Sequence, residues 1–293
     1  MKIRKSLGEK IFDVSNVSFL ILITLTAMLP IIHVVSGSLS SSNALIHSKV
    51  TFWPVEGTFE NIKLVAGNYA FWKSGWMTIR IVLLGTAINM FFTMITAYPL
   101  SKTNLKGRKF FMLLIIFTLV FQAPIIPTYL LVKNLHLLNS IWALVVPGAI
   151  SAFNMLLCIT FFRSVPEDLF DAARVDGMSE YRMVWSIVMP LSLPIVMTLL
   201  LFYSVGHWNN YYGPLLFIND RNNQTLQMYL FALIANGDSD SLAGGAAAEA
   251  SIKLFPVALQ MATIVLATIP VLLIYPFLQK HFVKGATLGS VKE

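Results

Sequence analysis

The sequence predicts an all-α integral membrane protein with six transmembrane helices. Of its 293 residues, 56% are apolar or aromatic and only 12% are charged, whereas roughly 25% of the residues of a soluble domain carry charge. Six stretches of the chain also run for about 20 residues without Asp, Glu, Lys or Arg, which is the length that a helix needs to cross roughly 30 Å of hydrocarbon. The single cysteine, Cys158, excludes an internal disulfide framework.

Each of the six stretches is expected to be helical, because hydrocarbon offers no hydrogen-bond partner to an exposed backbone group. The expected spans are residues 17–35, 81–100, 110–132, 140–162, 191–211 and 258–279. The first follows a basic leader, but its apolar core is longer than that of a cleaved signal peptide, so we expect it to be retained. Pro124, Pro127 and Pro147 are expected to bend the third and fourth spans.

The distribution of Lys and Arg predicts the orientation. With the N-terminus in the cytoplasm, the inner segments 1–16, 101–109, 163–190 and 280–293 hold 14 basic residues, and the outer side holds 7. The prediction is therefore a cytoplasmic N-terminal segment, a membrane domain over 17–279 and a cytoplasmic tail. The domain would include an inner loop over 163–190 and long outer loops over 36–80 and 212–256.

The sequence lacks the common catalytic motifs. It contains no G-x-x-x-x-G-K-[ST] phosphate loop, no H-E-x-x-H and no G-x-S-x-G, and its five histidines have no ligand spacing. We therefore predict no catalytic, cofactor-binding or metal-binding residue, and no enzyme activity in this chain. No compact basic surface suggests nucleic-acid binding, and the near absence of carboxylates from the spans disfavours proton-coupled transport.

The inner loop 163–190 is the segment best suited to a protein partner. An S-x-x-E pattern at 164–167 predicts a capping box for a helix over 166–175, and Gly177 predicts its end. Ser179 predicts the start of a second helix, which would run to Pro190. The small Ala172 and Ala173 would permit close approach of another protein. The alternative is a helix resting on lipid headgroups, but such a helix favours basic residues, and this loop has five acids against three bases.

Three motifs resemble the permeases of ATP-binding-cassette (ABC) importers. The run D-A-A-R-V-D-G at 171–177, followed by Ser179 and Met189-Pro190, resembles their "EAA" loop, with Asp171 in place of the usual Glu. The run W-N-N-Y-Y-G-P-L at 208–215 looks like the W-N-x-[FY]-x-x-P-L segment of the carbohydrate-type, MalG-like group. The ending F-V-K-G at 282–285 and G-S-V-K at 289–292 is similar to the branch for oligo- and polysaccharides.

This resemblance implies a type I ABC-importer permease fold with cytoplasmic coupling helices, in a bacterial cytoplasmic membrane. The chain would form the sugar path together with a second, homologous permease, and would receive sugar from an extracytoplasmic solute-binding protein. Two ATPase subunits would bind ATP and Mg, and this chain would bind no cofactor. The residues implied to couple to the ATPase are Glu167, Asp171, Ala172, Ala173, Asp176, Gly177 and Pro190.

The residues expected to line the sugar path are Trp208, Asn209, Asn210, Tyr211 and Tyr212. Their alternative role is an aromatic belt at the membrane interface. Asn89, Gln122 and Asn154 are expected to form hydrogen bonds between helices.

Other functions stay open at this point. They are a permease for a non-sugar solute, a self-contained secondary carrier and a structural membrane scaffold. The segment 237–251 suits either a mobile contact loop or a disordered connection.

Overall fold

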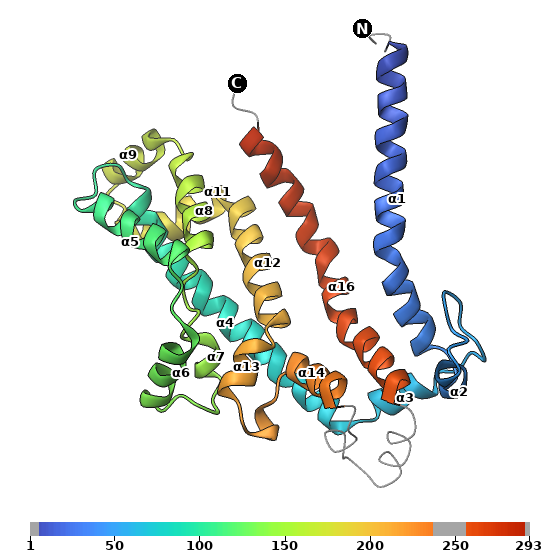
Figure 1. Cartoon of the computed structure of the whole chain (residues 1–293). Helices are drawn as coiled ribbons and strands as arrows, with labels where there is room; N and C mark the ends of the chain where they lie inside the picture. The colour runs from blue at the N-terminus through green and yellow to red at the C-terminus, as the bar shows by residue number, and fades with distance from the viewer. Residues whose placement is uncertain (1–5, 237–255, 291–293) are drawn as a thin grey trace. The chain divides into compact units, whose positions relative to one another are not determined.

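The computed structural model describes residues 6–236 and 256–290, with side chains as far as Pro276, and within these ranges every regular element is helical (Figure 1). The predicted all-α class is therefore confirmed. The segment 237–251 lies outside the described residues. The chain divides into two compact units, one from Met1–Phe71 and Ala232–Thr268 and the other from Trp72–Phe231 and Ile269–Glu293.

Three helices in the described part of the chain are long and apolar enough to cross a membrane. They are α1 (Leu7–Ser38), α4 (Tyr69–Ser101) and, within α16 (Pro256–Ser290), the stretch Val257–Pro276. These helices coincide with the first, second and sixth predicted spans. All three extend beyond the predicted boundaries, since α1 begins inside segment 1–16, α4 begins inside segment 36–80, and α16 continues into segment 280–293.

The third and fourth predicted spans are not continuous helices, which corrects the expectation for 110–132 and 140–162. Helix α5 (Arg108–Val120) is separated from α6 (Ile125–Asn134) by a bend of 111°. Pro124 causes this break, because proline disfavours helical geometry in the residue before it and provides no backbone N–H. The fourth span consists of the short α7 (Trp142–Val145), a non-helical stretch around Pro147, and α8 (Ala152–Arg163). The predicted bends at Pro124 and Pro147 are thus confirmed as full breaks, whereas Pro127 lies in the first turn of α6 and does not interrupt it.

The segment 163–191 forms a succession of short helices before the fifth span. Helix α9 (Glu167–Val175) is followed by α10 (Glu180–Met183), a π-helical turn (Val184–Val188) and α11 (Met189–Leu191). The chain then bends by 89° into α12 (Leu193–Asn209). Counting each bent pair as one span gives up to five spans among the described residues, so the structure does not establish six.

The predicted outer loops contain helices of their own. Within 36–80 these are α2 (Ser42–Ile46), α3 (Glu60–Ala66) and the start of α4. Within 212–256 these are α13 (Tyr212–Phe217), a 3-10 turn (Arg221–Asn223) and α14 (Leu226–Asn236). In the first unit, the buried amide of Asn61 donates to the carbonyl of Ser40 at 2.9 Å and so fixes α3 to the end of α1.

Polar side chains join α4 to α12 in the second unit. Asn89 Oδ1 accepts a hydrogen bond from His207 Nε2 at 2.6 Å, and Asn89 Nδ2 donates to the carbonyl of Gly148 at 2.5 Å. That carbonyl lies in the break after Pro147, where no helical N–H is available to it. One turn further along α4, the hydroxyls of Thr93 and Tyr203 lie 2.7 Å apart. The prediction that Asn89 connects helices is confirmed, whereas Gln122 is exposed.

Gly85 allows the His207 ring to lie directly against α4. A Cβ at this position would lie 2.5 Å from His207 Nε2. Gly85→Ala should therefore displace the ring, break its bond to Asn89 and cost about 1–3 kcal/mol of stability, as overpacking does elsewhere. We expect a lower thermal midpoint for the detergent-purified chain.

Gly75→Ala provides the matched control, because it lies on the same helix with nothing within 4 Å of the added carbon. It should leave the midpoint unchanged or raise it slightly, since Ala favours helices by about 1 kcal/mol over Gly. Equal midpoints for the two variants would contradict the close packing of His207 on Gly85.

Candidate functional site

Helix α9 begins differently from the predicted capping box. Pro166 occupies the N-cap position without a side-chain hydrogen bond, and the hydroxyl of Ser164 instead donates to the carbonyl of Phe161 at 2.6 Å. Ser164 thus completes the end of α8, and the capping-box prediction is wrong. The first turn of α9 nevertheless carries Glu167 and Asp168, whose negative charge is favourable at the positive end of a helix dipole.

The two faces of α9 have opposite character. Phe170 and Ala173 are buried in the core between α4, α8 and α12, whereas Asp171 and Ala172 are exposed. Of the two predicted small contact residues, only Ala172 therefore presents its side chain outward. Ala173 instead lets the helix pack closely on its own chain.

Helix α9 ends in a Schellman motif at Gly177. The N–H of Met178 donates to the carbonyl of Ala173 at 2.9 Å, and the N–H of Gly177 donates to that of Arg174 at 3.0 Å. Gly177 has a φ of +74°, in the left-handed region that favours glycine. The predicted glycine turn is confirmed, as is the second helix start, where Ser179 Oγ accepts from the N–H of Arg182 at 3.4 Å.

A chain of polar contacts connects α9 to the end of α4. Arg174 pairs with Asp171 at 2.9 Å and with Glu180 at 3.1 Å, and the Tyr98 hydroxyl donates to Glu180 at 2.5 Å. The hydrogen bond from Tyr98 lowers the pKa of Glu180, and the bond from Arg174 lowers it further. Glu180 thus stays ionised and links three elements.

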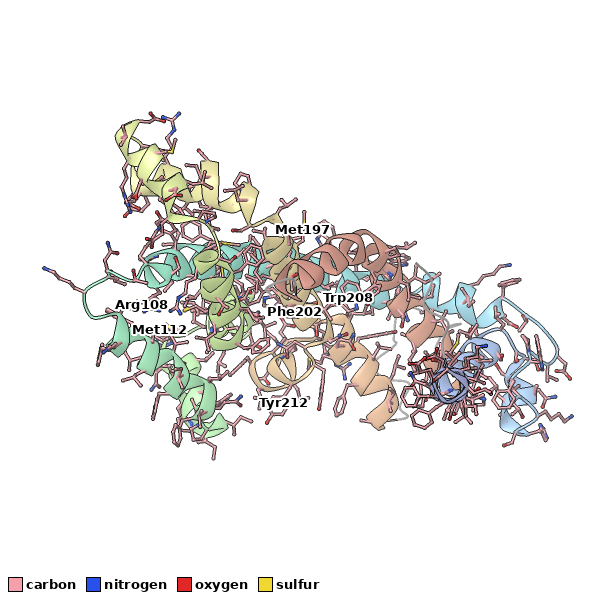
Figure 2. The ribbon with its side chains drawn as sticks, turned by 90° about the horizontal axis from the view of Figure 1, so that it is seen from above. Arg108, Met112, Met197, Phe202, Trp208 and Tyr212 are labelled. Carbon is pink, nitrogen blue, oxygen red and sulfur yellow. The ribbon has the colours of Figure 1, made fainter. Side chains whose placement is uncertain are left out.

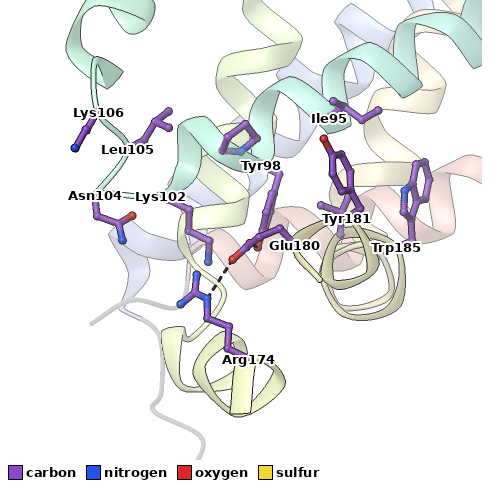
Figure 3. Close-up of a pocket in the computed structure, with 12 residues that line it drawn as sticks. Ile95, Tyr98, Lys102, Asn104, Leu105, Lys106, Arg174, Glu180, Tyr181 and Trp185 are labelled. Atoms are coloured by element: carbon purple, nitrogen blue, oxygen red, sulfur yellow. Dashed lines mark hydrogen bonds and ion pairs between the residues drawn. The ribbon is translucent and has the colours of Figure 1, made fainter. Parts of the chain in front are cut away.

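Lys102, just beyond the last residue of α4, lies over the aromatic part of the same contact. Its ammonium group is 3.0 Å from the centroid of the Phe170 ring and 5.3 Å from that of Tyr98. Figure 3 shows Lys102, Tyr98, Glu180 and Arg174 converging. The sequence analysis did not select any of these four residues. The sequence signal that could have indicated Glu180 was its position directly after Ser179, the predicted N-cap residue.

The second half of the loop leads into α12. Pro190 is exposed on α11, and the chain bends at the buried Ser192. Pro194 explains the bend, because it has no N–H for the carbonyl of Pro190 and its ring clashes there. One helical segment, Glu180–Leu191, thus lies between the Glu180 contact and the fifth span.

The predicted sugar-path residues fall into two groups. Trp208 is only 9% exposed and borders a narrow apolar pocket with Val82, Val205 and Val271. Tyr212 is 49% exposed and lies at the periphery of the helices (Figure 2). The two side chains, which are close in sequence, therefore differ in environment.

The other three members of this run also differ. Asn209 is exposed, and Asn210 Oδ1 accepts from the N–H of Gly213 at 3.0 Å, which supports the turn into α13. Tyr211 stacks on Phe231, with ring centroids 5.6 Å apart. The structure thus gives Asn210 and Tyr211 structural contacts within the chain.

The long apolar helices place the chain in the class of integral membrane proteins. The family described as the binding-protein-dependent transport system inner membrane component matches residues 64–287, and the chain belongs to this family. It is therefore an integral inner-membrane protein of the permease type, a class of subunit that is not itself catalytic.

Two curated relatives from Bacillus subtilis (strain 168) resemble nearly the whole chain. Protein LplC is 40% identical over 97% of this chain and 95% of its own length. The polygalacturonan/rhamnogalacturonan transport system permease protein YtcP is 38% identical over 97% of this chain and 99% of its own length. Among solved structures, a bacterial ABC transporter involved in the import of the acidic polysaccharide alginate matches with a TM-score of 0.87 and 30% identity. That match covers 96% of this chain and 100% of the other.

Proposed function

We propose that the chain is one of two permeases in an ABC importer for an oligosaccharide or polysaccharide. Its relative YtcP is a polygalacturonan/rhamnogalacturonan transport system permease, and the similar solved structure is an ABC transporter involved in the import of alginate. Both match this chain over almost its full length. The other permease would be homologous, two ATPase subunits would supply ATP hydrolysis, and an extracytoplasmic binding protein would deliver the sugar. A permease for a non-sugar solute is the alternative within the same class.

The observation that carries this proposal is the double attachment of α9. Phe170 is inserted beneath Lys102 and Tyr98 at the end of α4, and the Glu180–Leu191 segment leads from α9 into α12. A force on the exposed face of α9 would therefore reach the second and fifth spans together. That face carries Glu167, Asp171, Ala172 and Asp176, which we propose as the ATPase contacts, with Gly177 setting the helix direction.

The topology follows from the same proposal. Six crossings would place segments 1–16, 101–109, 163–190 and 280–293 in the cytoplasm, with the membrane domain over 17–279 and the outer loops 36–80 and 212–256 on the other side. The bent pair α5–α6 would then cross as one broken span, α7 together with α8 as another, and α12 as the fifth span. Such breaks are tolerated where they face protein or a water-filled path.

Reconstitution tests the proposal directly. The chain would be co-purified with a homologous permease and an ATPase from the same organism, inserted into liposomes and supplied with the binding protein. We expect ATP-dependent uptake of a labelled oligosaccharide that requires all the components. Uptake by liposomes that contain this chain alone would instead indicate a secondary carrier.

The isolated chain should not bind ATP. It has no phosphate loop, so we expect no saturable binding of a fluorescent ATP analogue until the ATPase subunit is added. Saturable binding by the purified chain alone would contradict the assignment of ATP and Mg to the partner.

A further inference from the structure

A pocket of about 700 Å³ lies beside the α9 attachment, between the end of α4, the following loop and α10 with its π-helical turn (Figure 3). One part of its wall is apolar and includes Ile95 and Val184. The other part is charged and includes Lys102, Lys106, Arg174 and the single carboxylate of Glu180. The proposed coupling of α9 uses the Arg174–Glu180 pair but leaves the cavity itself without a role.

We propose that this pocket binds the phosphate headgroup of an anionic phospholipid, with part of an acyl chain along the apolar wall. The proposal requires only that the chain lies in a membrane, and it is independent of the substrate and of the ATPase.

Along the axis of α4, the lining of the pocket changes from charged to apolar, as a phospholipid changes from headgroup to acyl chain. The charge-free run of this helix ends at Ser101, so Lys102 lies at the boundary of the hydrocarbon region. Ile95 lies seven residues earlier on the helix, roughly 10 Å deeper at the usual helical rise. This separation corresponds to the step from a headgroup to the first part of an acyl chain.

The opposite wall also has the chemistry of a membrane interface. Tyr181 and Trp185 are one helical turn apart, both are exposed, and both line the pocket. Amphipathic rings of this kind favour the level of the headgroups, and basic pockets between membrane helices bind anionic headgroups. In Figure 3, Tyr181 and Trp185 lie on the opposite side of the pocket from Lys106.

The charge of the pocket favours an anion. Glu180 is hydrogen-bonded to Arg174 and Tyr98, and its carboxylate also attracts Lys102, as do those of Glu167 and Asp171. The pocket lining itself nevertheless holds three basic side chains and one carboxylate. Partial burial lowers the pKa of Lys102, and the positive charge of Arg174 lowers it further. A phosphate in the pocket would offset both effects, whereas a neutral headgroup would offset neither.

Native mass spectrometry of the full chain tests the proposal. The chain would be released from nanodiscs of equal phosphatidylglycerol and phosphatidylcholine content, and the retained lipids would be counted. We expect preferential retention of phosphatidylglycerol and a loss of about fivefold in affinity for each pocket lysine removed, in Lys106→Gln and in Lys102→Gln/Lys106→Gln. Lys106→Gln alone keeps the contact of Lys102 with Phe170, so a loss of lipid in this variant would not come from misfolding.

Lys10→Gln/Lys109→Gln is the matched control, because it removes the same charge from residues that do not line the pocket. It should retain the lipid as the unchanged chain does. Equal losses in the two double variants, or equal retention of both lipids, would overturn the proposal. Displacement of the lipid by millimolar inorganic phosphate would also overturn it, in favour of a soluble phosphate ligand.

Quenching by brominated phosphatidylglycerol locates the site. Trp185 and Trp142 are similarly exposed, at 47% and 46%, but only Trp185 lines the pocket. The brominated lipid should therefore quench a smaller share of the total fluorescence in Trp185→Phe than in the unchanged chain. The part of the quenching that disappears in Lys106→Gln should also disappear in Trp185→Phe, but it should remain in Trp142→Phe. If removing Trp185 leaves that lysine-dependent quenching intact, the lipid does not bind in this pocket.

Discussion

Gly177→Val should abolish sugar-stimulated ATP hydrolysis in the assembled importer while leaving the chain in the membrane at near-normal levels. The φ of +74° at this residue is unfavourable for any L-residue by about 1–2 kcal/mol, and a β-branched side chain is the least tolerant of it. No atom lies within 4 Å of the position where the Cβ would be, so the effect would come from the backbone and not from a steric clash. The strain is too small to unfold the packed helices, but it would redirect α9.

Gly177→Asn separates this mechanism from a general loss of fold. Asn tolerates the left-handed region much better than Val, so Gly177→Asn should keep most of the ATPase stimulation. Asp171→Lys keeps the turn but reverses a charge on the exposed face of α9 and breaks the Asp171–Arg174 pair, so it should weaken association with the ATPase. Normal uptake by Gly177→Val would show that the direction of α9 does not matter for coupling.

The local features of this site could be predicted from the sequence, because each depends on a few neighbouring residues. Gly177 after Asp176 predicts a helix end, and Ser179 predicts the next helix start, and both are found. The contact of Glu180 with Tyr98 joins residues that are 82 positions apart, so no local pattern could reveal it. The capping-box prediction failed because Ser164 had a second possible partner, the carbonyl that ends α8.

The membrane helices show a similar limit. Freedom from charge predicts that a segment lies in the membrane, but it does not predict a continuous helix. The third predicted span breaks before Pro124 and turns by 111° although every residue from 110 to 132 is uncharged. At the next break, Asn89 supplies the hydrogen bond that the carbonyl of Gly148 lacks, from a helix 59 residues away in the chain. Hydropathy carries no information about such a partner.

The aromatic run at the end of α12, residues 208–212, should separate into a structural and a functional member. Trp208→Ala would empty a nearly buried site beside Val82 and Val205 and should cost about 3 kcal/mol or more, as the loss of a core Trp does elsewhere. We expect poor recovery of the assembled complex, measured by size-exclusion chromatography. Tyr212→Ala removes a half-exposed ring, so assembly should be normal, and uptake per assembled complex should fall if this ring stacks on the sugar.

Leu215→Ala is the matched control for Tyr212→Ala, since it truncates another exposed apolar side chain of α13. It should leave uptake unchanged, because an aliphatic side chain cannot provide the flat ring face on which a sugar stacks. Wild-type uptake by Tyr212→Ala would assign Tyr212 to an interfacial aromatic belt and remove it from the sugar path. Normal assembly of Trp208→Ala would in turn show that the α12 packing does not depend on the indole, which would return Trp208 to the candidates for direct sugar contact.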